Sequence, residues 1–344
     1  MPSFLGLPPE ERSRAYRAVT LLANRSAVIL EKDTWVCWAL SKLFGMPNRL
    51  PMAFKGGTSL SKVYGAIFRF SEDIDLTLDL TAGAPKFDPF DDQASKSSIK
   101  KHREKLGLLT AEHVANTLKP YLEKCAEGEA GSSACEFTIE GMDQEQLILR
   151  YPTALDPGED YIKRQVSMEF GGHNSLVPAE TKIVEPHLRA YLAVELSLPQ
   201  ARVNVLSPAR TFWEKATLIH VECCRREFRI GKERPSRHWY DLATLADQKI
   251  GRDALAARDI LEDVVRWKKT YWPTGSANYD DCLRQRLRLV PHAAALEALR
   301  QDYSAMVSHG MFEVEPPEFE EVVTRLERLE TEINGRRSDR DPVR

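Results

Sequence analysis

A pair of glycines, Gly56 and Gly57, separates a short apolar segment that resembles a strand from a segment that resembles a helix. Glycines at such a turn let backbone N–H groups approach an anion, and the N-terminus of the following helix favours phosphate. The glycine pair therefore predicts a nucleotide-binding turn, with Thr58 and Ser59 hydrogen-bonding the phosphates. The alternative is that these two hydroxyls only cap the helix.

An acidic strand follows the glycine turn. Its polar side chains alternate with Ile74, Leu76, Leu78 and Leu80, and they are Asp73, Asp75, Thr77 and Asp79. An Asp-x-Asp pair on a strand places both carboxylates on one face, about 6–7 Å apart at Cα, which suits a shared divalent metal. A strand with one solvated face would also alternate, but aspartate is depleted in strands. We therefore favour a metal site at Asp73 and Asp75, next to a phosphate site, and this combination predicts phosphoryl or nucleotidyl transfer.

Composition limits the class of protein. The chain has 344 residues and a formal charge of −3, which is long enough for two domains and does not suit a generic nucleic-acid coat protein. Its six cysteines have no framework spacing, so reduced thiols and a cytoplasmic protein are expected. No apolar run reaches membrane-spanning length, and the first residues lack the pattern of a secretion signal.

The order of patterns predicts an α+β protein. Two helices are expected over 9–45, and Asp33 would cap the second. A loop is expected over 82–98, followed by a helix over 99–125. Three further strands are expected over 136–139, 146–151 and 162–170. The part after Pro208 has long helical patterns, at about 209–229, 237–249, 253–267, 292–307 and 317–333. We therefore expect a catalytic part over 1–205 with a mixed sheet, and a helical domain over 206–344 that completes the active-site cleft.

Several further charged residues are candidates for the site. Glu169 alternates with Val166, Met168 and Phe170 and is the best candidate for a third metal ligand, although it would also suit an ordinary surface position. Lys55 and Arg69 flank the expected pocket and would contact phosphate or base, unless they are surface charges. Ser71 lies two residues before Asp73, so its phosphorylation or nucleotidylation would place negative charge near the metal ligands, and it is a hypothetical regulatory position.

The densest group of positive charges follows the helix over 209–229. It suits the backbone of RNA, or else a solvated helix end. Its candidate RNA-binding residues are Arg225, Arg226, Arg229, Lys232, Arg234 and Arg237.

Four stretches resemble the AbiEii/AbiGii toxin family of nucleotidyltransferases. They span roughly residues 30 to 245, in the family's order, and are Glu31-Lys32-Asp33-Thr34-Trp35-Val36, Gly56-Gly57-Thr58-Ser59-Leu60 with Tyr64, Arg69-Phe70-Ser71-Glu72-Asp73-Ile74-Asp75-Leu76, and Ser236-Arg237-His238-Trp239-Tyr240-Asp241-Leu242. The resemblance implies a DNA-polymerase-β-like nucleotidyltransferase core. It also implies that the protein is the toxic half of a toxin–antitoxin or phage-defence pair, with a cognate antitoxin as partner.

The resemblance also assigns roles to residues. It implies an acidic residue at Glu169 and a functional lysine at Lys215, whose ammonium would offset triphosphate charge. Asp241 would orient Lys215 or assist the incoming hydroxyl, unless it only compensates the dipole of its helix. The implied reaction transfers NMP from an NTP, with Mg²⁺ or Mn²⁺, to the 3′ end of a tRNA, and it blocks translation.

Two alternatives remain open from the sequence. One is a nucleotidyltransferase that modifies a protein or a small molecule. The other is a catalytically silent module that binds nucleic acid or the antitoxin. The spacing of His220, Cys223, Cys224 and His238 does not fit a structural zinc site. Neither a Walker A motif, a dinucleotide-binding glycine pattern nor a hydrolase nucleophile motif is present.

Overall fold

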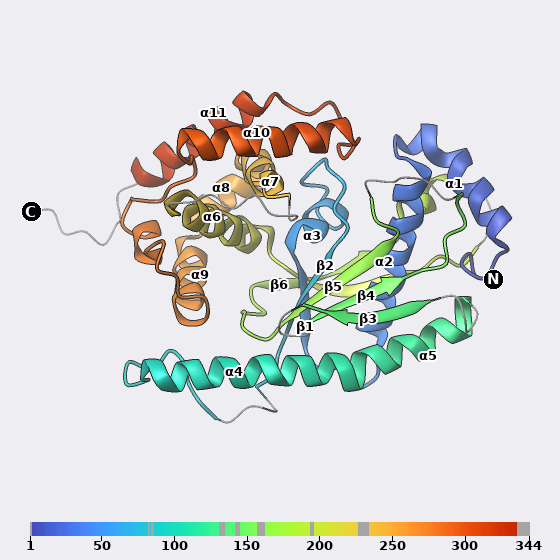
Figure 1. Cartoon of the computed structure of the whole chain (residues 1–344), viewed down its shortest axis with the longest axis horizontal. Helices are drawn as coiled ribbons and strands as arrows, with labels where there is room; N and C mark the ends of the chain where they lie inside the picture. Colours follow the sequence, from blue (N-terminus) through green and yellow to red (C-terminus); the bar gives the residue numbers. More distant parts are fainter. Residues whose placement is uncertain are drawn as a thin grey trace, which may run out of the picture. The chain divides into compact units, whose positions relative to one another are not determined.

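The computed structural model describes residues 2–81, 83, 86–130, 135–141, 145–156, 162–192, 196–225 and 234–335. The chain forms two compact units (Figure 1). The first unit comprises Met1–Gly65, Phe70–Pro89 and Gln93–Leu206. The second comprises Ala66–Arg69, Phe90–Asp92 and Ser207–Arg344. Each unit is described separately below.

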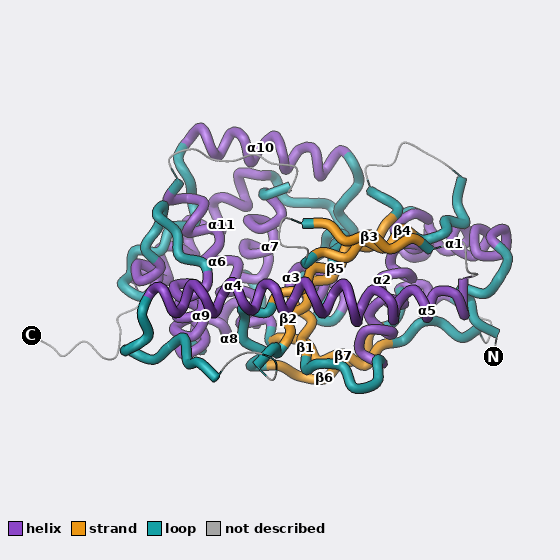
Figure 2. Tube along the Cα trace, turned by 60° about the horizontal axis from the view of Figure 1, so that its bottom comes forward, coloured by secondary structure: helices purple, strands orange, loops and turns teal. Residues whose placement is uncertain are grey.

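A mixed seven-stranded sheet forms the centre of the first unit (Figure 2, orange), in the order β3-β4-β5-β2-β1-β7-β6. The pairs β1–β7 and β2–β5 are parallel and the other neighbours are antiparallel. The strands are β1 (Met52–Lys55), β2 (Ile74–Leu78), β3 (Glu136–Glu140), β4 (Gln146–Arg150), β5 (Gln165–Gly171), β6 (Ala179–Val184) and β7 (Ala201–Leu206). The mixed sheet and the helical segments confirm the α+β prediction.

Two of these strands were not predicted. In β7, Val203 and Val205 are fully buried and alternate with Arg202 and Asn204, which is a strand pattern visible in the sequence. In contrast, β6 lies at the edge of the sheet and is largely exposed, so it has no apolar alternation to reveal it. Its pairing with β7 along its whole length decides its conformation.

The two predicted N-terminal helices are present as α1 (Pro9–Ala23) and α2 (Ala27–Gly45). The capping role expected for Asp33 is wrong. Ser26 caps α2, because its side chain accepts a hydrogen bond from the N–H of Ile29. Asp33 lies inside the helix, where it is buried and accepts a hydrogen bond from the backbone N–H of His187 at 2.7 Å.

The remaining helices of the first unit follow the predicted order. A short helix, α3 (Gly56–Lys62), begins at the glycine pair directly after β1. The helix expected over 99–125 is longer at both ends. It consists of α4 (Lys96–His113), a π-helical turn η1 (Val114–Leu118) and α5 (Lys119–Ala130), which form one continuous rod (Figure 1). A 3₁₀ turn, η2 (His187–Tyr191), lies between β6 and β7.

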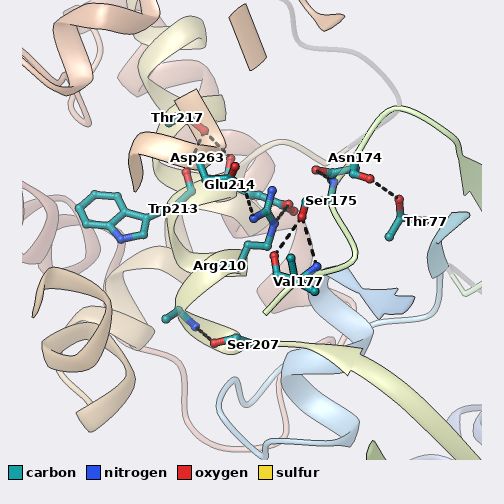
Figure 3. Close-up of polar contacts among 11 residues, drawn as sticks. Thr77, Asn174, Ser175, Val177, Ser207, Arg210, Trp213, Glu214, Thr217 and Asp263 are labelled. Carbon is teal, nitrogen blue, oxygen red and sulfur yellow. Dashed lines mark hydrogen bonds and ion pairs between the residues drawn. The ribbon is translucent and has the colours of Figure 1, made fainter. Parts of the chain in front are cut away.

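The second unit is helical. Its elements are α6 (Pro208–Cys224), α7 (Ser236–Ala246), α8 (Lys249–Ala256), α9 (Arg258–Tyr271), the 3₁₀ turn η3 (Tyr279–Cys282), α10 (Ala293–Ser308) and α11 (Phe319–Gly335). The pattern predicted as one helix over 253–267 belongs to two helices, α8 and α9, which meet at Ala257. Arg210 connects α6 to α9 as a buried arginine that pairs with Asp263 at 2.7 Å and with Glu214 at 3.3 Å (Figure 3).

Two further features concern the whole chain. All six cysteines are free thiols, and three of them (Cys37, Cys223 and Cys282) are buried. Within the described ranges, no helix is long and apolar enough to cross a membrane.

Candidate active site

The turn from β1 into α3 brings a glycine backbone against an acidic side chain. Gly56 has a φ of +77°, a conformation that side chains other than glycine rarely adopt. A Cβ built on Gly56 would lie 1.8 Å from Oδ2 of Asp75. Only glycine leaves room for this carboxylate, so the glycine turn and the acidic strand form one structural feature.

A second carboxylate lies beside Asp75 on the neighbouring strand. In the parallel pair β2–β5, Asp75 is directly in register with Glu169. Glu169 is exposed, and its Oε1 accepts a hydrogen bond from the side-chain amide of Gln146 on β4 at 3.1 Å. The backbone therefore places two predicted metal ligands side by side, and Asp73 lies directly before β2, two residues from Asp75.

The donor set determines which metal these residues suit. The residues that the structure describes include no group of three or more His, Cys, Asp and Glu side chains arranged to hold a metal ion. Magnesium is usually held by one or two carboxylates together with water and substrate phosphates, rather than by a complete protein cage. The carboxylates of Asp75 and Glu169, which lie in register on adjacent strands, are the type of oxygen donor that such a hard cation prefers. Asp73 stays a predicted third ligand.

Thr58 and Ser59 of α3, the two hydroxyls predicted to contact phosphate, are both buried and engaged in hydrogen bonds. Thr58 Oγ1 donates to Ser71 Oγ at 3.0 Å, and Ser59 Oγ donates to the carbonyl oxygen of Gly56 at 2.9 Å. Neither residue is the N-cap, which is Lys55. Lys55 is also the cross-strand partner of Asp75 in the antiparallel pair β1–β2. Of the predicted phosphate-binding residues, Lys55 and Gly56 therefore lie next to Asp75 of the acidic strand.

The segment before Asp73 is fixed by a buried ion pair that we did not predict. Lys32 of α2 is 2% exposed, and its Nζ lies 2.5 Å from Oε2 of Glu72 and 2.8 Å from the carbonyl oxygen of Lys163. Glu31, its neighbour, is fully buried and accepts hydrogen bonds from Thr153 and from the backbone of Ala154. The sequence did contain a signal for these buried charges. Glu31, Lys32 and Asp33 are consecutive charged residues in a helix whose other residues are mostly apolar, and such charges are buried only when they are paired.

Replacing Lys32 with methionine is expected to destabilise the protein by about 3–5 kcal/mol, because it leaves the carboxylate of Glu72 without its buried partner. Urea unfolding of the purified variant measures this change in the free energy of unfolding. Lys119→Met is the control, since it removes a partly exposed pair with Glu123 in the same unit and should cost less than about 1 kcal/mol. Equal effects of the two substitutions would contradict the prediction.

In the second unit, three predicted site residues come together around one carboxylate. Asp241 is fully buried and accepts two hydrogen bonds from Arg69, from Nε to Oδ1 and from Nη2 to Oδ2, each 2.7 Å long. Nζ of Lys215 lies 2.9 Å from Oδ2 of Asp241. The contact expected between Lys215 and Asp241 is present. The surface alternative for Arg69 is wrong, because Arg69 is 3% exposed and its guanidinium is held by Asp241 rather than displayed to solvent.

Helix geometry explains the place of Asp241. The helix α7 begins at Ser236 as expected, but Ser236 does not act as its N-cap. Its backbone N–H and hydroxyl both donate to Oδ2 of Asp302. Asp241 lies beyond the first turn and is paired with two cations. Dipole compensation alone, the other interpretation of this residue, therefore does not describe its environment.

Burial and charge act against each other in this cluster. Burial alone would raise the pKa of Asp241, but the charges of Arg69 and Lys215 outweigh it and hold that pKa below its usual range. Burial lowers the pKa of Lys215, and the attraction of Asp241 only partly offsets this. Desolvation and the nearby Lys215 and Arg237 hold the pKa of His238 well below its usual range, so His238 is neutral at pH 7.

The low pKa of His238 predicts acid sensitivity. The unfolded chain takes up a proton at His238 near pH 6.5, whereas the folded protein does so only at a lower pH. The free energy of unfolding therefore falls as the pH drops below about 6.5, by at most about 1.4 kcal/mol per pH unit from this residue. Urea unfolding between pH 7.5 and 5.5 measures the slope, which His238→Gln should reduce. An unchanged slope in the variant would contradict this assignment.

The predicted RNA-binding group is only partly described. Arg226, Arg229 and Lys232 lie outside the described residues. Arg225 follows α6 directly and pairs with Glu222 at 3.1 Å, and Arg237 lies in the first turn of α7. Arg234 precedes α7 and has a φ of +48°.

Gly56 offers a direct test of the glycine turn. Gly56→Ala would force a Cβ into the carboxylate of Asp75 and is expected to lower activity by about 100-fold, since small displacements of reacting groups have effects of this size. Gly65→Ala is the matched control, because Gly65 also has a positive φ (+56°) but has no atom within 4 Å of the added Cβ. Both substitutions carry a similar backbone strain, so equal losses of activity would show that the contact with Asp75 is unimportant.

The match to a family model agrees with the sequence resemblance. The family model described as "Nucleotidyl transferase AbiEii toxin, Type IV TA system" matches residues 38–325. No curated protein sequence gives a significant match. Among solved structures, the chain is similar to MenT4, a nucleotidyltransferase toxin of Mycobacterium tuberculosis H37Rv. The identity is 18%, the match covers 95% of this chain and 99% of that chain, and the TM-score is 0.42.

The family match extends over most of the chain and includes the glycine turn, the acidic strand, Glu169, Lys215 and Asp241. The protein belongs to the AbiEii family of nucleotidyltransferase toxins of type IV toxin–antitoxin systems.

Proposed function

We propose that this toxin uses Mg²⁺ or Mn²⁺ to transfer NMP from an NTP to an RNA acceptor, the 3′ end of a tRNA, and so blocks translation in the cytoplasm. One observation carries the proposal. Gly56, Asp75 and Glu169 come from three separate parts of the sequence and are adjacent through the sheet and the glycine turn. This arrangement supports a phosphate-bearing substrate held next to metal-binding carboxylates.

The roles of the residues follow from their chemistry. Asp73, Asp75 and Glu169 would hold the metal through oxygen atoms. When bound, the metal would neutralise charge on the phosphates and favour attack at the α-phosphorus. The first N–H groups of α3 have no partner inside the helix and would face the phosphates of the nucleotide. Glycine at position 56 keeps this backbone close to Asp75. Lys215 and Asp241 remain predicted catalytic residues on the basis of the family resemblance.

The proposed acceptor rests on the family and on surface charge. A tRNA 3′ end is what the family resemblance implies, and the arginines near the end of α6 and the start of α7 suit a phosphate backbone. The family description implies an antitoxin as partner.

Labelled nucleotides test the reaction and the acceptor together. The purified protein is incubated with total tRNA and each of the four NTPs, carrying the label at either the α- or the γ-phosphate. Nucleotidyl transfer predicts that the α-label enters RNA and that the γ-label leaves with pyrophosphate. Periodate-oxidised tRNA, which lacks the terminal diol, should accept nothing.

The same experiment separates the alternatives. Label in a protein or small molecule, but not in RNA, would favour a transferase with another acceptor. If no label is transferred and Asp73→Ala still inhibits growth as the wild type does, a silent binding module would replace the enzyme.

A further inference from the structure

A second arginine-rich surface lies in the second unit, outside the group predicted from the sequence. Arg284, Arg286 and Arg288 are all exposed, and they lie between η3 and α10. Residues 286–289 have no regular secondary structure, and their exposure alternates: Arg286 and Arg288 are exposed, whereas Leu287 and Leu289 are 1% and 0% exposed. The alternation of exposed arginines with buried leucines places Arg286 and Arg288 on the solvent side of this segment.

Side chains from three helices fix the backbone of this segment. Asn334 of α11 exchanges two hydrogen bonds with Leu287, both 3.0 Å long. The N–H of Arg288 donates to Nδ1 of His220 on α6 at 3.0 Å, and the carbonyl oxygen of Leu289 accepts from Trp239 of α7 at 3.0 Å. Glu330 of α11 accepts from the N–H groups of Leu289 and Val290. The arginines are therefore carried by a fixed backbone, which reduces the entropy lost when they bind a ligand.

The neighbours of this segment carry charges of both signs, and most of them pair with one another. Arg225 follows α6, the helix that holds Arg288 through His220, and Lys269 at the end of α9 pairs with Asp280 of η3 at 2.7 Å. Arg286 pairs with Asp281 of η3 at 3.2 Å, but its side chain remains 62% exposed. Of the acidic side chains named here, Asp281 pairs with Arg286 itself. Glu222 pairs with Arg225, Asp280 pairs with Lys269, and Glu330 accepts hydrogen bonds from the backbone.

We propose that Arg284, Arg286 and Arg288 form a docking surface for the phosphate backbone of the RNA acceptor. We call it the arginine surface. It deepens the proposed function, on which it rests for the identity of the ligand. A repeating anion suits several exposed arginines on a segment whose backbone is held by hydrogen bonds, because each planar guanidinium can bind phosphate oxygens in pairs. The whole protein carries a net charge of −3, so attraction of RNA requires a local basic surface of this kind.

Equilibrium binding of total tRNA to the full-length protein, without NTP, tests the arginine surface. Arg286→Gln/Arg288→Gln is compared with Arg252→Gln/Arg328→Gln, which removes two exposed arginines from α8 and α11 of the same unit. We expect the first variant to bind tRNA about tenfold more weakly and to reduce the salt dependence of log K by about two. The control variant should bind as the wild type does.

A third variant separates charge from folding. Arg286→Lys/Arg288→Lys keeps both charges, so it should retain the wild-type salt dependence with a smaller loss of affinity. Wild-type affinity and salt dependence in the glutamine variant would overturn the proposal. So would a glutamine variant that loses binding to the antitoxin but not to tRNA.

The outcome is distinguishable from failure of the proposed function. If the wild type transfers nucleotide to tRNA while the glutamine variant binds and reacts normally, only the arginine surface is wrong. If the wild type transfers no nucleotide to RNA, the proposed acceptor is wrong, and the binding comparison still decides whether this surface holds nucleic acid.

Discussion

Asp75→Asn is expected to lower nucleotide transfer by about 10³-fold or more and to abolish toxicity. The amide has the shape of the carboxylate, so the contact with Gly56 and the pairing with Glu169 remain possible. The substitution removes the negative charge that would bind the metal. The metal would then no longer stabilise the negative charge that develops on the phosphate in the transition state. Incorporation of α-labelled NTP into tRNA measures the rate, and growth after induced expression measures toxicity.

Asp79→Asn is the matched control for this substitution. Asp79 follows β2, four residues after Asp75, but its Oδ1 accepts hydrogen bonds from the N–H and hydroxyl of Thr81. Its charge therefore has a local structural partner, and we expect activity to stay within about twofold of the wild type. A fully active Asp75→Asn variant would refute the metal-binding role of the acidic strand. Added Mn²⁺ that partly restores the variant would support it.

Asp241→Ala is expected to destabilise the second unit by about 3–5 kcal/mol. Arg69 and Lys215 are buried and both face this carboxylate, so its removal leaves two cations without their shared partner. The low pKa of Asp241 gives the direction of the pH effect. Its contribution to stability is complete above about pH 4, the pKa in the unfolded chain, and is lost as the pH falls further.

Urea unfolding at pH 7 compares this variant with Asp247→Ala. Asp247 follows the same helix but pairs with Arg325 at 3.3 Å while 48% exposed, so its loss should cost less than about 1 kcal/mol. Replacing Arg69, Lys215 and Asp241 together with apolar residues should restore part of the stability, because no buried charge is left unpaired. If Asp241→Ala unfolds like the wild type, the cluster does not support the fold.

Periodicity and turn chemistry were sufficient for much of the fold. The glycine turn, the acidic strand and strands β3 to β5 lie where the sequence predicts them, because local alternation and glycine conformation report local structure. The division between α8 and α9 was missed because both helices bury residues of one apolar pattern. Strand β6 was missed because an exposed edge strand has no alternation of its own.

For the candidate site, the sequence predicted individual residues but not which of them are neighbours. Glu169 was chosen from alternation along its own strand, but only the register with β2 places it beside Asp75. The partners of buried charges could not be chosen from the sequence. Lys32 pairs with Glu72, and Arg69 pairs with Asp241, and the two residues of each pair are far apart in the sequence.

The sequence by itself determined the residues of the chemistry, namely a glycine that tolerates a positive φ and carboxylates on one face of a strand, since both depend on local backbone geometry. The tertiary structure decided which charges are buried together. It also decided that Arg69 is buried against Asp241, whereas Arg284, Arg286 and Arg288 are exposed to solvent. That choice depends on long-range packing, because a buried charge is stable only where another part of the chain supplies its partner.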